Sequence, residues 1–411
     1  MVAPPYAGHL NPLLVIARHL RSRGVETGFV TGPGKLPLCR DLGFDAVPAV
    51  ADDPGAMERI ANTRRRVAGH PVRAARQVRD NLRLLPRALV DVQDAADRWQ
   101  PDAIVADFCA PVAGVVARRA GVLWVTTIPT PFAIENRRGT PAYCGGWAPP
   151  HGPAGRLRDG LARAATRSVK QLAGRVFRTE LEVFGGSLYR PDGSEVFYSD
   201  RAILAFGLAS LEFDRDWPEA LQFIGPVTSI PGEADQPQLL PDDRPRVLVT
   251  LGTHLHWAKR DLVHAVTSLA QQVPSHAFVV SLGDVRGGGT PTRVAPRVQV
   301  LSWVPYDLAM DAFVAVVHHG GAGITYSSLR AALPCLVWPQ DYDQFDFAAR
   351  IVQHGLGLRV NSLHTTRAAE SLRRTLELPT EPLIRFSDEL RASDPLGQVD
   401  RTLARLLPPA G

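Results

Sequence analysis

Cysteine is scarce in this chain, and the few cysteines lie far apart. None belongs to a Cys-x-x-Cys pair, and the four are Cys39, Cys109, Cys144 and Cys335. Closely spaced pairs are typical of disulfide frameworks and structural zinc sites. Their absence argues against both and is usual for proteins of a reducing compartment.

Long apolar runs are absent as well. No stretch approaches the roughly 20 consecutive apolar residues that a membrane-spanning helix needs. The N-terminus lacks a cationic region followed by an apolar one, which a secretory signal would have. We therefore expect a cytoplasmic protein with no membrane span, although the first predicted strand, Val2–Ala3, is so short that the natural start could lie upstream.

Lysine is rare, whereas arginine is common. The 46 basic residues include only Lys35, Lys170 and Lys259 as lysines, and the net charge is +5. The sequence contains no basic stripe interleaved with aromatics, no helix-turn-helix pattern and no zinc-finger spacing. These absences argue against nucleic acid as a partner, and the run 64–66 of three arginines is interpreted as a solvated helix face.

The hydrophobic pattern divides the 411 residues into two α/β halves, because the chain is too long for one ordinary core. Strands are predicted at 25–31, 101–108, 122–129, 246–253, 277–283, 298–303, 313–319 and 334–339. Helices are predicted at 13–23, 57–99, 112–120, 258–273, from about 322, and at 344–354. Residues 133–195 are expected to form long loops and irregular helices over a binding cleft.

A stretch rich in Pro, Asp and Gln supplies the predicted linker, residues 226–245. It separates a predicted N-terminal domain, 1–225, from a predicted C-terminal domain, 246–411. The terminal helices of the second domain could pack back on the first.

A histidine stands in an unusual turn near the start of the chain. The segment AGHLNP, residues 7–12, places His9 between a short apolar strand and the predicted helix 13–23. Ligands of parallel α/β sheets bind at the carboxyl ends of the strands. Residues predicted at such ends are His9, Asp107, Thr253, Trp303 and His319. His9 is therefore either a turn residue or a catalytic base, and the turn alone does not decide between them.

A glycine-rich turn follows the strand 313–319. Its sequence, Gly-Gly-Ala-Gly at 320–323, leads directly into a predicted helix. Glycines let the backbone approach a ligand, and the N–H groups and dipole at a helix N-terminus favour an anion. The pattern indicates a phosphate site, although glycines also serve ordinary tight turns.

Three sequence blocks in the second half carry a resemblance to a known family. They are Trp303-Val304-Pro305, then His319-Gly320-Gly321-Ala322-Gly323-Ile324-Thr325, and then Trp338-Pro339 followed by Asp343-Gln344. In order and spacing the chain resembles the family-1 nucleotide-sugar glycosyltransferases, above all the bacterial enzymes that tailor antibiotics and other natural products. The resemblance implies the GT-B fold, an α/β architecture in which two Rossmann-like, doubly wound domains face each other across an interdomain cleft.

The resemblance also implies how a sugar donor binds. Trp303 would stack on the nucleotide base, His319 would contact the diphosphate, and Asp343 with its neighbour would hold sugar hydroxyls. The implied donor-binding residues are Thr253, Trp303, Val304, His319, Gly321, Gly323, Thr325, Ser327, Asp343 and Gln344. Structural alternatives are a core tryptophan, an interior histidine and an N-terminal helix cap.

Within this family, the Gly-His-x-x-Pro turn presents the general base. The resemblance therefore implies that His9 takes the proton of an acceptor hydroxyl and that Asp107 orients the imidazole. Asp102 is the alternative acid, but it precedes its strand and should lie at the other end of the sheet. The implied reaction is an inverting transfer from a nucleotide diphosphate sugar to a small, largely apolar aglycone. Regions 57–99 and 130–195 should line the acceptor site.

No cofactor and no metal are expected. Two Asp-x-Asp triplets, at 214–216 and 341–343, could bind a divalent ion, but the glycine turn, the helix end and His319 already meet the diphosphate charge. Oligomeric state, as monomer or homodimer, stays open.

Three positions depart from the family pattern: Ile324, Ser327 and Phe347 stand where Ser or Thr, Glu and Asn are common. Because the family Glu binds both ribose hydroxyls, Ser327 predicts that dTDP-sugars are accepted at least as well as UDP-sugars. A glycolipid-forming rhamnosyltransferase, a non-catalytic helper protein and a GT-B epimerase are the alternatives. A Rossmann oxidoreductase is disfavoured because no G-x-G-x-x-G follows the first strand.

Overall fold

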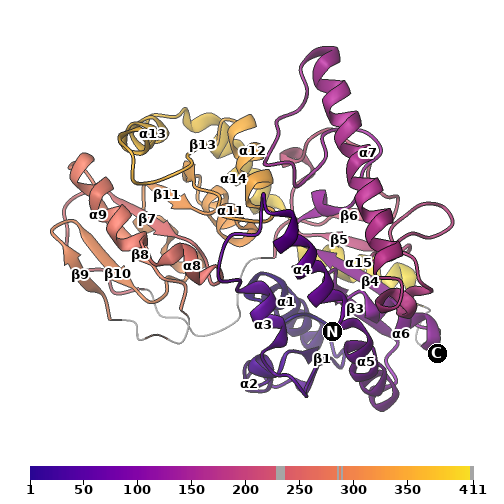
Figure 1. The fold of residues 1–411 in the computed structure, drawn as a ribbon. Helices are drawn as coiled ribbons and strands as arrows, with labels where there is room; N and C mark the ends of the chain where they lie inside the picture. Colours follow the sequence, from indigo (N-terminus) through magenta and orange to yellow (C-terminus); the bar gives the residue numbers. More distant parts are fainter. Residues whose placement is uncertain (228–236, 285–286, 288–289, 408–411) are drawn as a thin grey trace.

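The computed structural model describes residues 1–227, 237–284, 287 and 290–407, and it consists of two α/β halves that lie side by side (Figure 1). The first half contains the strands β1 (Gly28–Thr31), β2 (Asp45–Pro48), β3 (Ala103–Asp107), β4 (Leu123–Ile128), β5 (Ile203–Ala205) and β6 (Leu221–Phe223). The second contains β7 (Arg246–Thr250), β8 (Ala277–Ser281), β9 (Thr292–Ala295), β10 (Val298–Leu301), β11 (Ala315–His318), β12 (Cys335–Val337) and β13 (Gly357–Arg359).

Every strand pairing of the first half is parallel. The four strands β3-β4-β5-β6 form one sheet and β1-β2 another, and Val2 forms single parallel bridges to Val30 and Ala106 that join the two. The predicted strand Val2–Ala3 is thus reduced to one residue that pairs on both sides. The helices here are α1 (Ala7–Ser22), α2 (Leu36–Asp41), α3 (Ala56–Ala61), α4 (Pro71–Leu82), α5 (Leu85–Trp99), α6 (Val112–Ala120) and α7 (Gly152–Val176).

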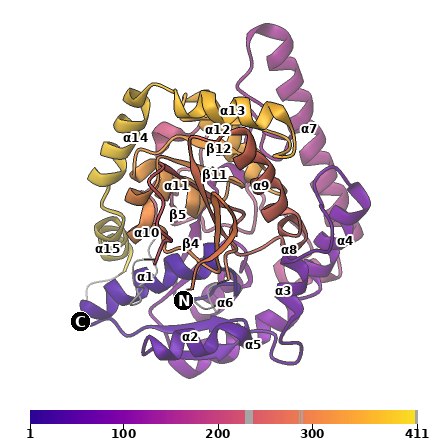
Figure 2. The same cartoon turned by 90° about the vertical axis from the view of Figure 1, so that its left-hand side faces the viewer.

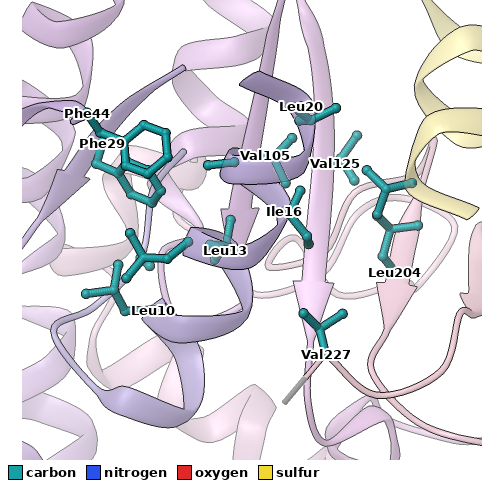
Figure 3. Packing of buried hydrophobic residues seen from close by; sticks show 14 of the residues in the cluster. Leu10, Leu13, Ile16, Leu20, Phe29, Phe44, Val105, Val125, Leu204 and Val227 are labelled. Atoms are coloured by element: carbon teal, nitrogen blue, oxygen red, sulfur yellow. The ribbon is translucent and has the colours of Figure 1, made fainter. Parts of the chain in front are cut away.

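Helix α1 begins at Ala7, so the prediction that residues 7–12 form a turn before the helix is wrong. The residue before a proline normally avoids helical geometry, so Asn11-Pro12 suggested that the helix begins only after this pair. Leu10 and Leu13 are fully buried against the sheet, together with Ile16 and Phe29 (Figure 3). Burying such a side chain contributes about 1.5–3 kcal/mol, which offsets the local preference.

The second half has one seven-stranded sheet of order β13-β12-β11-β7-β8-β10-β9, parallel except for β9. Here the first strand, β7, lies beside β11, and Thr250 pairs with His318 at their carboxyl ends. This is the place where strand order reverses, and ligands of doubly wound sheets bind there. The helices are α8 (His256–Lys259), α9 (Leu262–Gln272), α10 (Tyr306–Ala309), α11 (Ala322–Arg330), α12 (Gln344–Gln353), α13 (Thr366–Leu376), α14 (Thr380–Ala392) and α15 (Pro395–Leu406).

Helix α15 lies against α1 in the first half, as both views show (Figures 1 and 2). Val399 belongs to the buried cluster of that half, and Asp400 pairs with His19 at 2.9 Å and Arg23 at 2.7 Å. The chain therefore returns to its first half at the end. Of the predicted linker 226–245, residues 228–236 lie outside the described part of the chain, and the predicted domain limits stay predictions.

Helix α7 is the largest departure from the predicted elements. Its 25 residues fall inside 133–195, which was expected to be irregular, and it extends away from the remaining structure (Figures 1 and 2). Its large apolar side chains face outward; Leu157 and Leu161 are each 64% exposed. Four glycines and one proline lie within this helix, and these poor helix formers made the segment look irregular in the sequence. In the chain as described, no helix has the length and apolarity to cross a membrane.

Candidate active site

His9 and Asp107 meet at the carboxyl end of the first sheet. His9 lies in the first turn of α1, and its Nδ1 is 3.0 Å from both Oδ1 and Oδ2 of Asp107, the last residue of β3. An Nδ1–H that donates to the carboxylate leaves the lone pair of a neutral ring on Nε2. Asp102 lies just before β3, at the opposite end of the sheet, as expected. The sequence-predicted pair is therefore brought together.

The electrostatics of this pair are set by burial and by the carboxylate. Burial acts to lower the pKa of His9, but the charge of Asp107 and its hydrogen bond hold that pKa well above the usual value. The Asp107 side chain is fully buried and also accepts the backbone N–H of Cys109 at 2.8 Å. His9 keeps 22% of its side chain exposed, so a substrate can reach the ring.

Two aromatic side chains, absent from the predicted site, surround His9. Tyr6 meets it edge to face at 5.7 Å, and Phe108 lies at the same centroid distance. Tyr6 also packs edge to face on His254 of the second half, at 5.4 Å. In the sequence, only their position marks these residues. Phe108 directly follows Asp107, His254 directly follows Thr253, and Tyr6 lies three residues before His9. The two halves thus touch within one residue of the base.

His319 lies between the loops that follow β7 and β11. A Cβ added to Gly252 would come within 2.8 Å of its Cε1, and one added to Gly321 within 2.5 Å of its Nε2. Only glycine permits this packing, because a side chain at Gly252 or Gly321 would overlap the imidazole ring. Burial lowers the pKa of His319 to about 4, and its Nδ1 is buried without a hydrogen-bond partner among the described residues.

The turn after His319 opens into the N-terminus of α11, as predicted. Gly321 occupies the cap position, and a Cβ on Gly323 would meet nothing within 4 Å, so the turn has open space beside it. Its geometry is held from behind by His318, whose Nδ1 accepts the N–H of Gly320 at 3.0 Å. Helix-end N–H groups, open space and an unpartnered imidazole nitrogen form a place for an anion.

The other predicted donor-binding residues differ in exposure: some are partly exposed to solvent and others are buried. Thr253 and Trp303 are partly exposed in the loops after β7 and β10. The side chains of Val304 and Thr325 are fully buried, so they support the site from inside. Ser327 lines a cavity of about 440 Å³ at the junction of the two halves.

Asp343 and Gln344 stand at the start of α12. Burial raises the pKa of Asp343 to about 7, and the charge of His9 in the first half acts to lower it. Asp343 makes no capping hydrogen bond with its side chain, which disfavours the cap as its role. The Oε1 of Gln344 accepts the N–H groups of Gln340 at 2.8 Å and Asp341 at 3.1 Å, so this amide oxygen stabilises the loop itself.

The two Asp-x-Asp triplets are engaged by backbone N–H groups. Asp341 accepts those of Val67 at 2.6 Å and Ala68 at 2.7 Å, which join the two halves. Asp216 accepts those of Arg137 and Arg138. One carboxylate of each triplet is therefore already engaged by backbone N–H groups.

Both predicted acceptor regions contact the second half of the molecule near the start of α12. Region 57–99 contains α3, α4 and α5, and α3 and α4 border a cavity of about 610 Å³. Region 130–195 contributes Tyr143, whose backbone N–H donates to Asp346 of α12 at 3.0 Å. Arginines line the first cavity: Arg59, Arg64, Arg65, Arg73, Arg76 and Arg83.

Comparison with known proteins finds one matching family model and several related enzymes. Residues 269–396 match the family described as erythromycin biosynthesis protein CIII-like, C-terminal domain. The chain is 28% identical to elloramycin glycosyltransferase ElmGT of Streptomyces olivaceus over 87% of this chain and 84% of that protein. It is 27% identical to 4'-demethylrebeccamycin synthase of Lentzea aerocolonigenes over 95% and 94%.

Solved structures agree on the fold. The glycotransferase of kitacinnamycin superposes with a TM-score of 0.74 at 23% identity, covering 99% of this chain and 98% of that one. The chain therefore has the GT-B fold, and its similarity to these curated enzymes supports glycosyl transfer as its class of reaction. The predicted fold class and the predicted enzyme class are thereby confirmed. The calicheamicin glycosyltransferase CalG4 also superposes over 99% of this chain and 98% of its own, with a TM-score of 0.70 at 19% identity.

Proposed function

We propose that this glycosyltransferase inverts the anomeric centre as it moves a sugar from a dTDP- or UDP-sugar to a hydroxyl of a small, largely apolar natural product. The observation that carries the proposal is the His9–Asp107 pair, 3.0 Å apart, at the end of the first sheet where Tyr6 beside His9 packs on His254 of the second half. A base with an orienting carboxylate on one side and a sugar-holding segment on the other is what a single displacement requires.

The chemical step follows from this arrangement. The neutral imidazole of His9 accepts the proton of the acceptor hydroxyl through Nε2 as the oxygen attacks the anomeric carbon. The bond from that carbon to the nucleotide diphosphate oxygen breaks on the opposite face, and an α-linked donor gives a β-glycoside. Asp107 stabilises the imidazolium that forms, as the carboxylate does in a serine-protease triad.

The diphosphate leaves as an anion, and the turn before α11 would receive it. The backbone N–H groups at that helix end stabilise negative charge, and the buried, unpartnered Nδ1 of His319 is available for one more hydrogen bond. Trp303 would stack on the heterocyclic base of the nucleotide. With these groups at the diphosphate, we propose that the reaction uses neither a metal nor another cofactor.

Relatives support the choice of substrates. One superposed structure, the Streptomyces glycosyltransferase SsfS6, was solved with thymidine diphosphate, and another, the spinosyn rhamnosyltransferase SpnG, with spinosyn aglycone. A dTDP-sugar and an apolar aglycone are therefore our first candidates. The arginine-lined cavity beside α3 and α4 would suit an acceptor that also carries an acidic or phenolic group.

A panel of nucleotide sugars and aglycones, read by mass spectrometry, would identify the substrates. Nuclear magnetic resonance of the product then tests the stereochemistry. An α-linked donor should give a β-linked product, and an α-linked product would contradict the single displacement at His9.

A further inference from the structure

A thiol lies next to the proposed base. Cys109 follows β3, is exposed, and has its Sγ within 4.8 Å of a ring nitrogen of His9. Its backbone N–H donates to Oδ1 of Asp107 at 2.8 Å, which fixes the loop on the same carboxylate that orients His9. The proposed transfer assigns no role to this thiol.

Sulfur, nitrogen and oxygen donors converge here from two rigid elements, the first turn of α1 and the end of β3. One ligand atom from each of His9, Asp107 and Cys109 lies within 4.8 Å of the others. Donor atoms on a tetrahedral zinc ion are separated by about 3.5 Å, given bond lengths of roughly 2.0–2.3 Å. Small side-chain rotations therefore suffice to bring the three atoms to that separation.

We propose that His9, Asp107 and Cys109 form a binding site for a thiophilic divalent cation, represented by Zn²⁺, and that the bound cation blocks sugar transfer. A thiolate, an imidazole and a carboxylate are the donor types that Zn²⁺ prefers, whereas Mg²⁺ and Ca²⁺ prefer oxygen alone. Binding displaces the thiol proton to solvent, and the exposed side of Cys109 provides the entry path. The cation takes Nδ1, which faces Asp107, so the ring proton moves from Nδ1 to Nε2 and Nε2 can no longer accept the substrate proton.

Cation binding stands independently of the proposed function, whereas inhibition rests on His9 as the base. The test therefore uses two readouts on the full chain, freed of metal by chelation. The first is absorbance with Co²⁺, a spectroscopic substitute for Zn²⁺, which should give a thiolate-to-cobalt charge-transfer band at one cation per chain. The second is sugar transfer during titration with Zn²⁺.

Cys109→Ser should keep sugar transfer within a few-fold in chelator, lose the cobalt band, and need at least tenfold more Zn²⁺ for half inhibition. Cys144→Ser, at a partly exposed thiol of the same half, serves as the matched control and should keep the wild-type cobalt band and the wild-type dependence of inhibition on Zn²⁺. His9→Ala should weaken the cobalt band, which keeps the test informative although that variant is inactive. Mg²⁺ at equal concentration should not inhibit.

Equal Zn²⁺ sensitivity in wild type and Cys109→Ser, or no charge-transfer band in wild type, would overturn the site. A wild type that shows the band yet transfers sugar at full rate with Zn²⁺ bound would leave the cation site standing and contradict His9 as the base.

Discussion

The Asp341 carboxylate of the second half accepts the backbone N–H of Val67 in the first half at 2.6 Å. A second bond, from Ala68 at 2.7 Å, makes the contact bidentate, and it lies two residues from Asp343 at the candidate sugar site. Around it, His254 contacts Asn62 at 3.3 Å across the same junction. The first and second halves are thus joined by hydrogen bonds from the loop 62–68.

From this contact we predict that Asp341→Asn loosens the loop 62–68. One amide N–H₂ would replace an oxygen and oppose a backbone N–H, leaving a buried donor unpaired at about 1–3 kcal/mol. Hydrogen exchange of amides 62–68 should accelerate by about tenfold or more. Asp214→Asn, at an exposed carboxylate, is the control and should change nothing there. Unchanged exchange in Asp341→Asn would show that the contact does not hold the loop.

Nucleotide diphosphate should draw both halves together. Amides near His9 as well as those near His319 are expected to gain protection, because donor and base sites belong to opposite halves. Hydrogen exchange with saturating dTDP measures this directly. Protection confined to residues 246–360 would count against coupling between the halves.

The pH dependence of transfer follows from the raised pKa of His9. Only the neutral imidazole accepts a proton, so kcat/KM should rise with pH and level off only above the usual histidine range. Asp107→Asn removes the charge that raises the pKa, and the midpoint should therefore move to lower pH while the plateau falls. An aliphatic acceptor avoids ionisation of the substrate itself. A midpoint that stays fixed in Asp107→Asn would separate Asp107 from the titrating group.

Ser327 should relax the choice of nucleotide. A Glu in that place would reach both ribose hydroxyls, whereas serine is shorter and does not demand a 2′-hydroxyl. Calorimetry should show wild type binding dTDP at least as tightly as UDP, with Ser327→Glu shifted toward UDP. Wild type binding UDP more than tenfold tighter, with no shift in the variant, would contradict this assignment.

In the second half the sequence predicted β7, β8, β10, β11 and β12, because these strands are short apolar runs bounded by turns, but it did not place β9 or β13. Helix α6 was predicted with the observed bounds, 112–120. Helix α7 was missed because it contains four glycines and a proline. The start of α1 was missed because the packing of Leu10 overrides the conformational bias of the residue before Pro12. Cross-half contacts such as Tyr6 with His254 depend on how the halves sit together, which no local pattern encodes.

The most direct test of the account is His9→Ala, assayed with a matched dTDP-sugar and an aliphatic hydroxyl acceptor. The variant should fold and bind nucleotide diphosphate as wild type does, because His319 and the α11 turn are untouched. Its turnover should fall at least about a hundredfold, the usual scale for loss of a general base. Turnover near that of wild type would contradict His9 as the base of this glycosyltransferase.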